Sequence, residues 1–149
     1  CVAVGLLVTN IVYSHAVLDL KADAQAEKMT FARLLKSNNM RLFFSALFNI
    51  LPFIIVIIGV VLGRLHWAYL CVLPLLPMGI YLIYSLKAHL DNKEIAFEPR
   101  WWMGPMGNFD NYKKHNMDWF LIRWLVARNL VTFFCLILMI VNIILAIYK

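Results

Sequence analysis

Long hydrophobic runs dominate this chain. Three of them, at residues 42–62, 65–86 and 130–148, are apolar on every face, whereas surface helices of soluble proteins carry polar residues on one side. Each run has about the 20 residues that an α-helix needs to cross roughly 30 Å of hydrocarbon. A fourth run, at 1–18, is nearly as apolar but contains polar positions such as Asn10, which favours contact with protein or a cavity over contact with lipid.

These runs predict an all-α fold, a polytopic transmembrane helical bundle. Hydrophobic residues make up 63% of the 149 residues and charged residues only 15%, which is the balance expected of a membrane protein. The predicted spans lie at about 1–18, 42–62, 65–86 and 124–148, with polar loops at about 19–41 and 87–123.

Positive charge lies almost entirely on one side of these spans. Of the 14 Lys and Arg residues, 12 lie in or beside the loops at 19–41 and 87–123, and only Arg64 and Lys149 fall on the other side. Short loops rich in Lys and Arg stay in the cytosol, so both loops are predicted to be cytosolic in an integral protein of the cell inner or plasma membrane. The lipid bilayer accounts for the net charge of +6, and no nucleic-acid partner is expected.

The chain begins at Cys1, inside an apolar run, and we interpret it as the C-terminal part of a longer protein. Its three cysteines, Cys1, Cys71 and Cys135, all lie in apolar runs and form no CxxC pattern. This arrangement predicts neither a disulfide nor a zinc site.

Two carboxylates mark the point where the first run enters the polar loop. Asp19 and Asp23 are four residues apart, which places them on one face of a helix. Mg²⁺ is commonly held by one or two carboxylates, with substrate phosphates and water as the remaining ligands. Most such pairs in proteins are solvated helix caps, so the spacing alone leaves both interpretations open.

The residues after the second aspartate carry a family resemblance. The stretch DLKADAQAEKMTFARLL, from Asp19 to Leu35, resembles the second aspartate-rich motif of UbiA-type membrane prenyltransferases: DxxxD, a short spacer, Lys28, Thr30 and an Ala-containing run. The spacing is most like that of the branch that prenylates 1,4-dihydroxy-2-naphthoate in menaquinone biosynthesis. Members of this family have nine transmembrane helices around a central cavity, and the second aspartate-rich motif follows the sixth helix. The resemblance therefore implies that residues 1–149 are the C-terminal part of a single prenyltransferase domain.

The resemblance also implies a mechanism. Asp19 and Asp23 would bind Mg²⁺ as the catalytic and metal-ligating residues, Lys28 would contact the diphosphate, and a polyprenyl diphosphate would donate its prenyl group to an aromatic acceptor. Hydroxybenzoate, homogentisate, glycerol phosphate and carotenoid acceptors remain open, as does a non-catalytic membrane assembly or transport subunit in which the aspartates cap a helix. One departure is Glu27, which occupies the place before the lysine where the family usually has a glycine able to adopt positive φ.

Several other polar residues in apolar surroundings have two interpretations each. His15 is either a packing residue or an acceptor-side base, and Arg123 and Arg128 are interpreted as reaching lipid headgroups in preference to phosphate. Asn49 and Asn142 are expected to make hydrogen bonds between helices. The aromatic-rich segment 98–120 is interpreted as interfacial, with a lid over a site as the alternative.

Overall fold

The computed structural model describes residues 1–93, 98–107 and 109–147, and within these residues every regular element is helical. The long helices are α1 (Val2–Leu18), α4 (Asn38–Val61), α5 (Leu76–Leu90) and α7 (Asp118–Ile147). The short ones are α2 (Leu20–Gln25), α3 (Phe31–Leu34), α6 (Phe109–Lys114) and the 3₁₀ segments η1 (Trp67–Leu75) and η2 (Trp101–Met103). The prediction of an all-α fold is confirmed for the described part of the chain.

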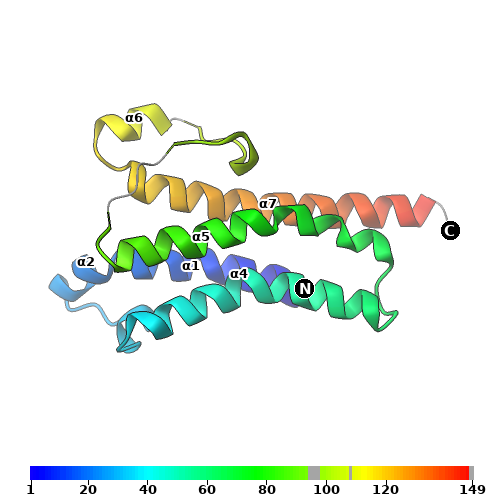
Figure 1. Cartoon of the computed structure of the whole chain (residues 1–149), viewed down its shortest axis with the longest axis horizontal. Helices are drawn as coiled ribbons and strands as arrows, with labels where there is room; N and C mark the ends of the chain where they lie inside the picture. The colour runs from blue at the N-terminus through cyan, green and yellow to red at the C-terminus, as the bar shows by residue number, and fades with distance from the viewer. Residues whose placement is uncertain (94–97, 108, 148–149) are drawn as a thin grey trace.

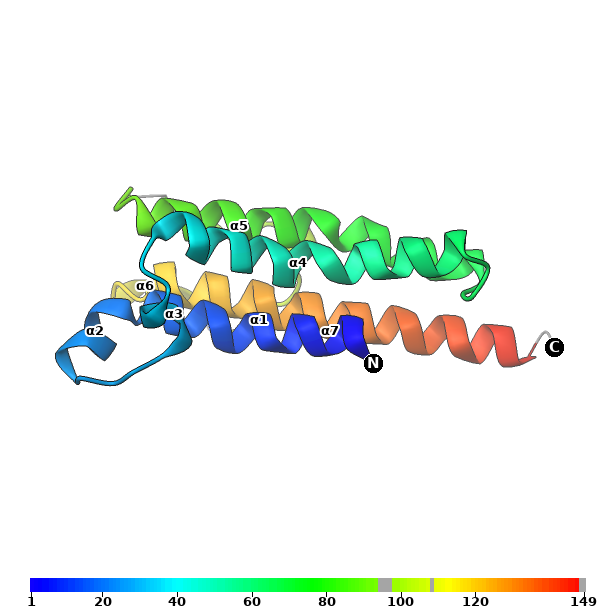
Figure 2. The ribbon, with the colours of Figure 1, turned by 90° about the horizontal axis from the view of Figure 1, so that it is seen from below.

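The four long helices lie side by side along the long axis of the molecule (Figure 1). Seen from below, α4 and α5 form one layer and α1 and α7 the other (Figure 2). Each helix contacts one neighbour in its own layer and one in the other, because α1 packs on α4 and α7 while α5 packs on α4 and α7. The arrangement is a small four-helix bundle with α2, α3 and α6 gathered at one end.

Three helical segments are long and apolar enough to cross a membrane: Asn38–Val61, the continuous segment Trp67–Leu90, and Asp118–Ile147. They correspond to three of the four predicted spans. The fourth, at 1–18, is the 17-residue helix α1, which is apolar but shorter than the others. Helix α1 ends at Asp19, whose backbone N–H donates to the carbonyl of His15.

The helices extend further into the polar loops than the apolar runs predict. Helix α4 begins at Asn38, four residues early, because the Ser37 hydroxyl accepts a hydrogen bond from the Met40 N–H at 3.2 Å and caps the helix. Helix α7 begins at Asp118, with an acidic residue in its first turn, where a negative charge complements the helix dipole. Hydropathy marks the lipid-facing part of a helix, whereas its ends are set by caps.

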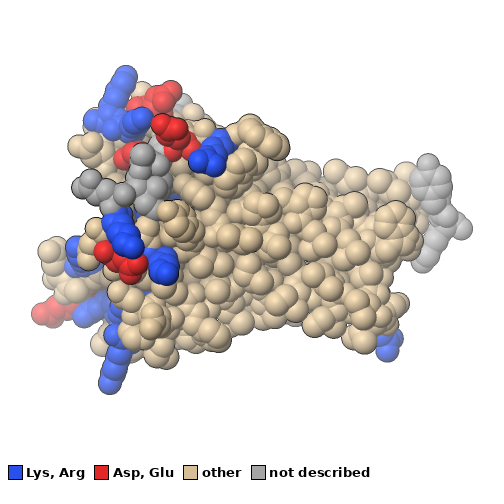
Figure 3. Space-filling model, viewed as in Figure 1, with Lys and Arg blue, Asp and Glu red and all other residues tan. Residues whose placement is uncertain are grey.

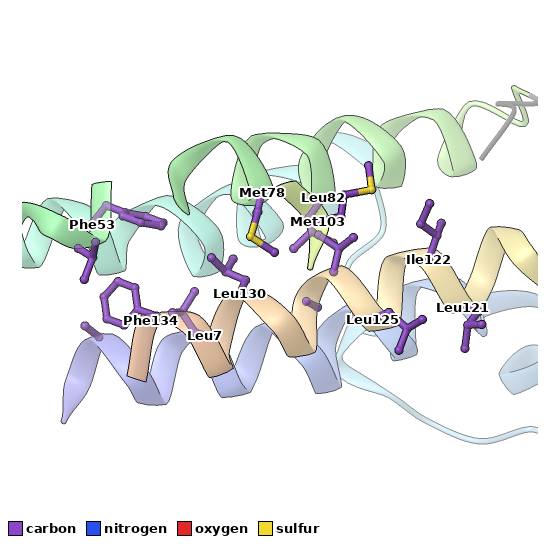
Figure 4. Packing of buried hydrophobic residues seen from close by; sticks show 14 of the residues in the cluster. Leu7, Phe53, Met78, Leu82, Met103, Leu121, Ile122, Leu125, Leu130 and Phe134 are labelled. Carbon is purple, nitrogen blue, oxygen red and sulfur yellow. The ribbon is translucent and has the colours of Figure 1, made fainter. Parts of the chain in front are cut away.

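Buried side chains from all four long helices meet between the two layers (Figure 4). At one end of this cluster, the rings of Phe53 and Phe134 pack edge to face at a centroid distance of 5.6 Å. The largest side chains of this cluster include Leu7, Met78, Met103, Ile122 and Leu130. A second, smaller cluster around Tyr13, Val17 and Leu86 packs near the polar end of the bundle.

Two buried asparagines join the layers. Asn10 on α1 donates from Nδ2 to Asn49 Oδ1 at 3.1 Å, and Asn49 on α4 donates back to Asn10 Oδ1 at 2.9 Å. The Tyr69 hydroxyl donates to Asn142 Oδ1 at 2.6 Å, which joins η1 to α7. Both expectations from the sequence are confirmed: Asn10 and Ser14 of the first run are buried against protein, and Asn49 and Asn142 form interhelical hydrogen bonds.

Charged residues gather at the end of the bundle that carries α2 and α6, while the rest of the visible face is almost free of charge (Figure 3). This is the end where the two charged loops meet, as the distribution of Lys and Arg predicts. Their cytosolic orientation stays a prediction.

Part of the aromatic-rich segment lies against α7. The Asn129 side chain donates to the carbonyls of Met103 at 2.8 Å and Pro105 at 3.0 Å, and Arg128 Nη2 donates to the same Pro105 carbonyl at 3.1 Å. Met103 is buried in the main hydrophobic cluster, whereas Trp101 is 94% exposed. Arg128 therefore helps to hold this loop against α7. The interpretation that Arg128 reaches lipid headgroups did not predict this contact.

Candidate functional site

The two aspartates of the motif follow one another on a continuous helical path. Asp19 joins α1 to α2, and the Asp23 N–H donates to the Asp19 carbonyl at 2.7 Å, as in a helical turn. The predicted helical spacing is therefore present in the backbone. The side chains differ in environment, because Asp19 is exposed whereas Asp23 is only 7% exposed.

Asp19 lines an open cleft of about 1290 Å³ at the polar end of the bundle. The cleft lies where α1 and α2, the start of α4, the end of α5 and the start of α7 meet. Among the described residues, the charged lining is mostly cationic: Lys21, Arg33, Arg41, Lys93 and Arg123, against the carboxylates of Asp19 and Asp118. Apolar residues, among them Val17, Leu18 and Leu90, complete the wall toward the bundle.

Asp23 and Lys28 lie outside the lining of this cleft. The Lys28 Nζ is 3.8 Å from Asp23 Oδ1, and the Lys28 side chain is 69% exposed. The structure thus brings Lys28 to the second aspartate and only the first aspartate to the cleft. Within the described residues, no group of three or more His, Cys, Asp and Glu side chains is arranged to hold a metal ion.

Glu27 adopts a positive φ, the conformation that a glycine at this place would permit. Its φ is +53°, and the turn around it is a Schellman motif, in which the Lys28 N–H donates to the Asp23 carbonyl at 2.9 Å and the Glu27 N–H to the Ala24 carbonyl at 3.3 Å. The sequence left open whether a glutamate in place of glycine changes the course of the loop. The structure shows that the backbone at Glu27 is left-handed, as a glycine would allow.

Replacing Glu27 with glycine is expected to stabilise the protein by about 1 kcal/mol, because a left-handed residue with a Cβ is strained and glycine is not. The midpoint of thermal unfolding in detergent measures the change. Asn92 follows α5 in an equivalent turn, with φ +52°. Asparagine tolerates left-handed backbone, so Asn92→Gly should raise the stability much less than Glu27→Gly and serves as the matched control. An equal rise of the unfolding midpoint in the two variants would contradict the prediction.

Arg123 is the clearest feature that the sequence did not reveal. It is 3% exposed, and its guanidinium donates to the Ser85 carbonyl from Nη2 at 2.8 Å and to the Trp119 carbonyl from Nη1. The interpretation that it reaches lipid headgroups is wrong, because α5 covers it. No spacing marks Arg123 in the sequence, since its neighbours on α7 are apolar on all sides.

His15 lies beside a second, smaller pocket of about 310 Å³, which it shares with residues of α6, α7 and the turn between them. Its ring stacks on Phe120 at a centroid distance of 5.3 Å. The packing interpretation of His15 thus agrees with its contacts, and the pocket around it is otherwise aromatic and aliphatic.

Comparisons with family models, with curated proteins and with solved structures gave no match for this chain. The motif and the cleft are therefore the features from which a function can be argued.

Proposed function

We propose that this chain is the C-terminal part of a UbiA-type membrane prenyltransferase, which transfers a polyprenyl group from its diphosphate to an aromatic acceptor. The observation that carries the proposal is the position of Asp19. The first aspartate of the resembling motif lines a mainly cationic cleft at the polar end of an apolar helical bundle.

The chemistry of the cleft suits an amphiphilic diphosphate. Five cationic side chains attract the phosphate oxygens, and Arg in particular matches their geometry. The apolar part of the lining, which includes Val17, Leu18 and Leu90, would shield the first part of an isoprenoid tail from water.

Magnesium fits this donor set through Asp19. Mg²⁺ needs only one or two carboxylates when substrate phosphates supply further ligands, and Asp19 is exposed in the cleft. Asp23 would join it only after separating from Lys28. A bound Mg²⁺ would stabilise the negative charge that develops on the departing diphosphate. Asp19 itself would anchor the charged head of the donor at the mouth of the bundle.

The favoured acceptor is 1,4-dihydroxy-2-naphthoate, as in menaquinone biosynthesis, because the spacing of the motif is most like that branch. This choice rests on the residues from Asp19 to Leu35 alone. The other acceptors of the superfamily stay as alternatives.

One observation favours a second candidate, a non-catalytic membrane assembly or transport subunit. Asp23 is buried and ion-paired with Lys28, and its carbonyl accepts a hydrogen bond from Arg33, as expected of a purely structural helix end. On this alternative the aspartate pair only caps and anchors the loop.

A thermal shift experiment separates the two candidates, on protein purified after expression from its complete reading frame. A prenyltransferase should be stabilised by farnesyl diphosphate only when Mg²⁺ is also present, since a ligand that binds the native state raises the unfolding temperature. Farnesol with Mg²⁺ is the control for binding of the tail alone. No shift with farnesyl diphosphate and Mg²⁺ would overturn the proposed function.

A further inference from the structure

Part of the chain between α5 and α6 runs back along α7 before it returns to the polar end of the bundle. In Figure 1 this yellow-green segment lies over α7, away from the end that carries α2 and α6. It includes residues 98–107 and, within them, η2. None of the residues 98–107 lines the cleft or the smaller pocket beside His15. For this part of the aromatic-rich segment, the contacts therefore do not support a lid over either cavity.

Contacts with α5 and α7 fix the depth of the segment in the bundle. The Trp102 ring packs on Tyr81 of α5 at a centroid distance of 5.5 Å. Gly104 lies against the ring of Phe133 on α7. Tyr81 is five residues from the end of its apolar run, and Phe133 is three residues from the start of its own. At about 1.5 Å per residue, both contacts lie roughly 5–8 Å inside the apolar part of the bundle.

Protein groups satisfy backbone carbonyls of the segment at this depth. The Asn129 side chain donates to the carbonyls of Met103 and Pro105, and Arg128 donates to that of Pro105 as well. The Met103 N–H donates to the Arg100 carbonyl at 3.0 Å. Irregular backbone is tolerated at membrane depth where it is buried in protein, because lipid offers it no hydrogen bonds. These bonds to α7 are therefore what a segment that dips into a bilayer requires.

One large side chain of the segment is left exposed by the described residues. Trp102, Met103 and Met106 pack on or within the main hydrophobic cluster, whereas Trp101 is 94% exposed. Tryptophan combines a large apolar ring with one polar N–H, and it is enriched where a membrane meets water. The position of Trp101 beside apolar helices thus favours contact with lipid over contact with water.

A second exposed tryptophan lies at the other end of the same helical segment. Trp67 begins η1 and is 69% exposed. From Trp67 to Tyr81 the chain has nine 3₁₀ residues and then five α-helical steps, which together rise about 25 Å. The hydrocarbon core of a bilayer is about 30 Å thick. The two exposed tryptophans therefore lie at levels that match its two boundaries.

We propose that residues 98–107 form a shallow re-entrant segment that inserts the Trp101 ring into the bilayer, at the boundary between headgroups and acyl chains. The partner is phospholipid, which at this depth offers apolar chains to the ring and polar groups to its N–H. Insertion by about 5–10 Å is typical of interfacial segments. The inference goes beyond the proposed function and does not depend on it, because it uses only the packing of the segment on α5 and α7.

The test is quenching of tryptophan fluorescence in vesicles that contain the protein expressed from its complete reading frame. The lipid quencher is phosphatidylcholine brominated near the carbonyl end of one acyl chain, which acts on rings close to that depth. Trp101→Phe should remove at least about twice as much lipid-quenched emission as the matched control Trp102→Phe, since a ring at the boundary is reached by lipid and a packed ring is not. Because Trp101 is exposed, its replacement should leave folding intact.

Iodide in the water phase is the second quencher and separates the other possible surroundings of Trp101. A loss of mainly iodide-quenched emission in Trp101→Phe would place the ring in water and overturn the insertion. No change in either kind of quenching would mean that protein covers the ring, which would also overturn it. Equal losses of lipid-quenched emission in Trp101→Phe and Trp102→Phe would contradict the proposed orientation of the segment.

Discussion

Asp19→Asn is expected to lower Mg²⁺-dependent prenyl transfer by about 10²–10³-fold, the usual loss when one group that stabilises developing charge is removed. The substitution keeps the size of the side chain and removes its charge. Since Asp19 is exposed in the cleft, folding should be unaffected. The measurement is the rate of prenyl transfer from a labelled prenyl diphosphate to 1,4-dihydroxy-2-naphthoate, in membranes that contain the protein expressed from its complete reading frame.

The control for this experiment is Asp118→Asn. Asp118 is a second carboxylate among the described residues that line the cleft, but it is the first residue of α7 and lies outside the aspartate motif. Its loss should change the rate less than about three-fold, the small effect expected of an acidic residue in the first turn of a helix. Unchanged activity in Asp19→Asn, or an equal loss in both variants, would contradict a metal-binding role for the motif.

Asp23→Asn in the same assay tests the second aspartate. The resemblance implies that it too binds Mg²⁺, so its variant should lose activity by a similar factor. The structure offers a second reason for a loss, because Asp23 is buried and paired with Lys28. A lower unfolding temperature with normal activity would assign Asp23 to the loop and leave Asp19 as the metal ligand.

Gly104→Ala is expected to destabilise the protein by about 3 kcal/mol, the combined cost of strained backbone and overpacking. Gly104 has φ +79° and ψ −168°, a region that only glycine adopts readily. A Cβ there would lie 2.7 Å from Phe133 Cε2 and 3.0 Å from Asn129 Nδ2. The clash would push the loop away from α7 and break the Asn129 hydrogen bonds that hold it.

Gly107→Ala is the matched control for this substitution. Gly107 also has positive φ, at +56°, but a Cβ there would meet no atom of the described residues within 4 Å, so only about 1 kcal/mol of backbone strain is expected. Both changes can be measured as shifts in equilibrium unfolding by SDS. Similar costs at the two glycines would mean that the contact with α7 contributes little.

The sequence predicts the segments of this fold well and their ends less well. An apolar run can be recognised from composition alone, because lipid forces a spanning segment to satisfy its own backbone as a helix. The ends depend on single capping residues such as Ser37, and the 3₁₀ geometry of η1 in the third span is not visible in the hydropathy. The first run satisfies the composition criterion, but its helix α1 has 17 residues and is shorter than the three helical segments long enough to cross a membrane.

The candidate site was predicted in part. The motif led to Asp19, which the structure places in a charged cleft, and to the unusual position of Glu27, which adopts positive φ as a glycine would. It also led to Lys28, which lies against Asp23 and not in the cleft. The side-chain direction of residues after a helix end depends on the turn, and the spacing of the motif does not contain that information.

The sequence by itself determined that this chain is a set of long apolar helices with its charge concentrated in two loops, because composition and run length are local properties. Only the tertiary structure decided which of those charges meet. Helices that are apolar on every face carry no periodic signal for their rotation about their own axes. The burial of Arg123 under α5, and its meeting with Arg33, Arg41 and Asp19 around one cleft, therefore depend on how α1, α4, α5 and α7 pack together.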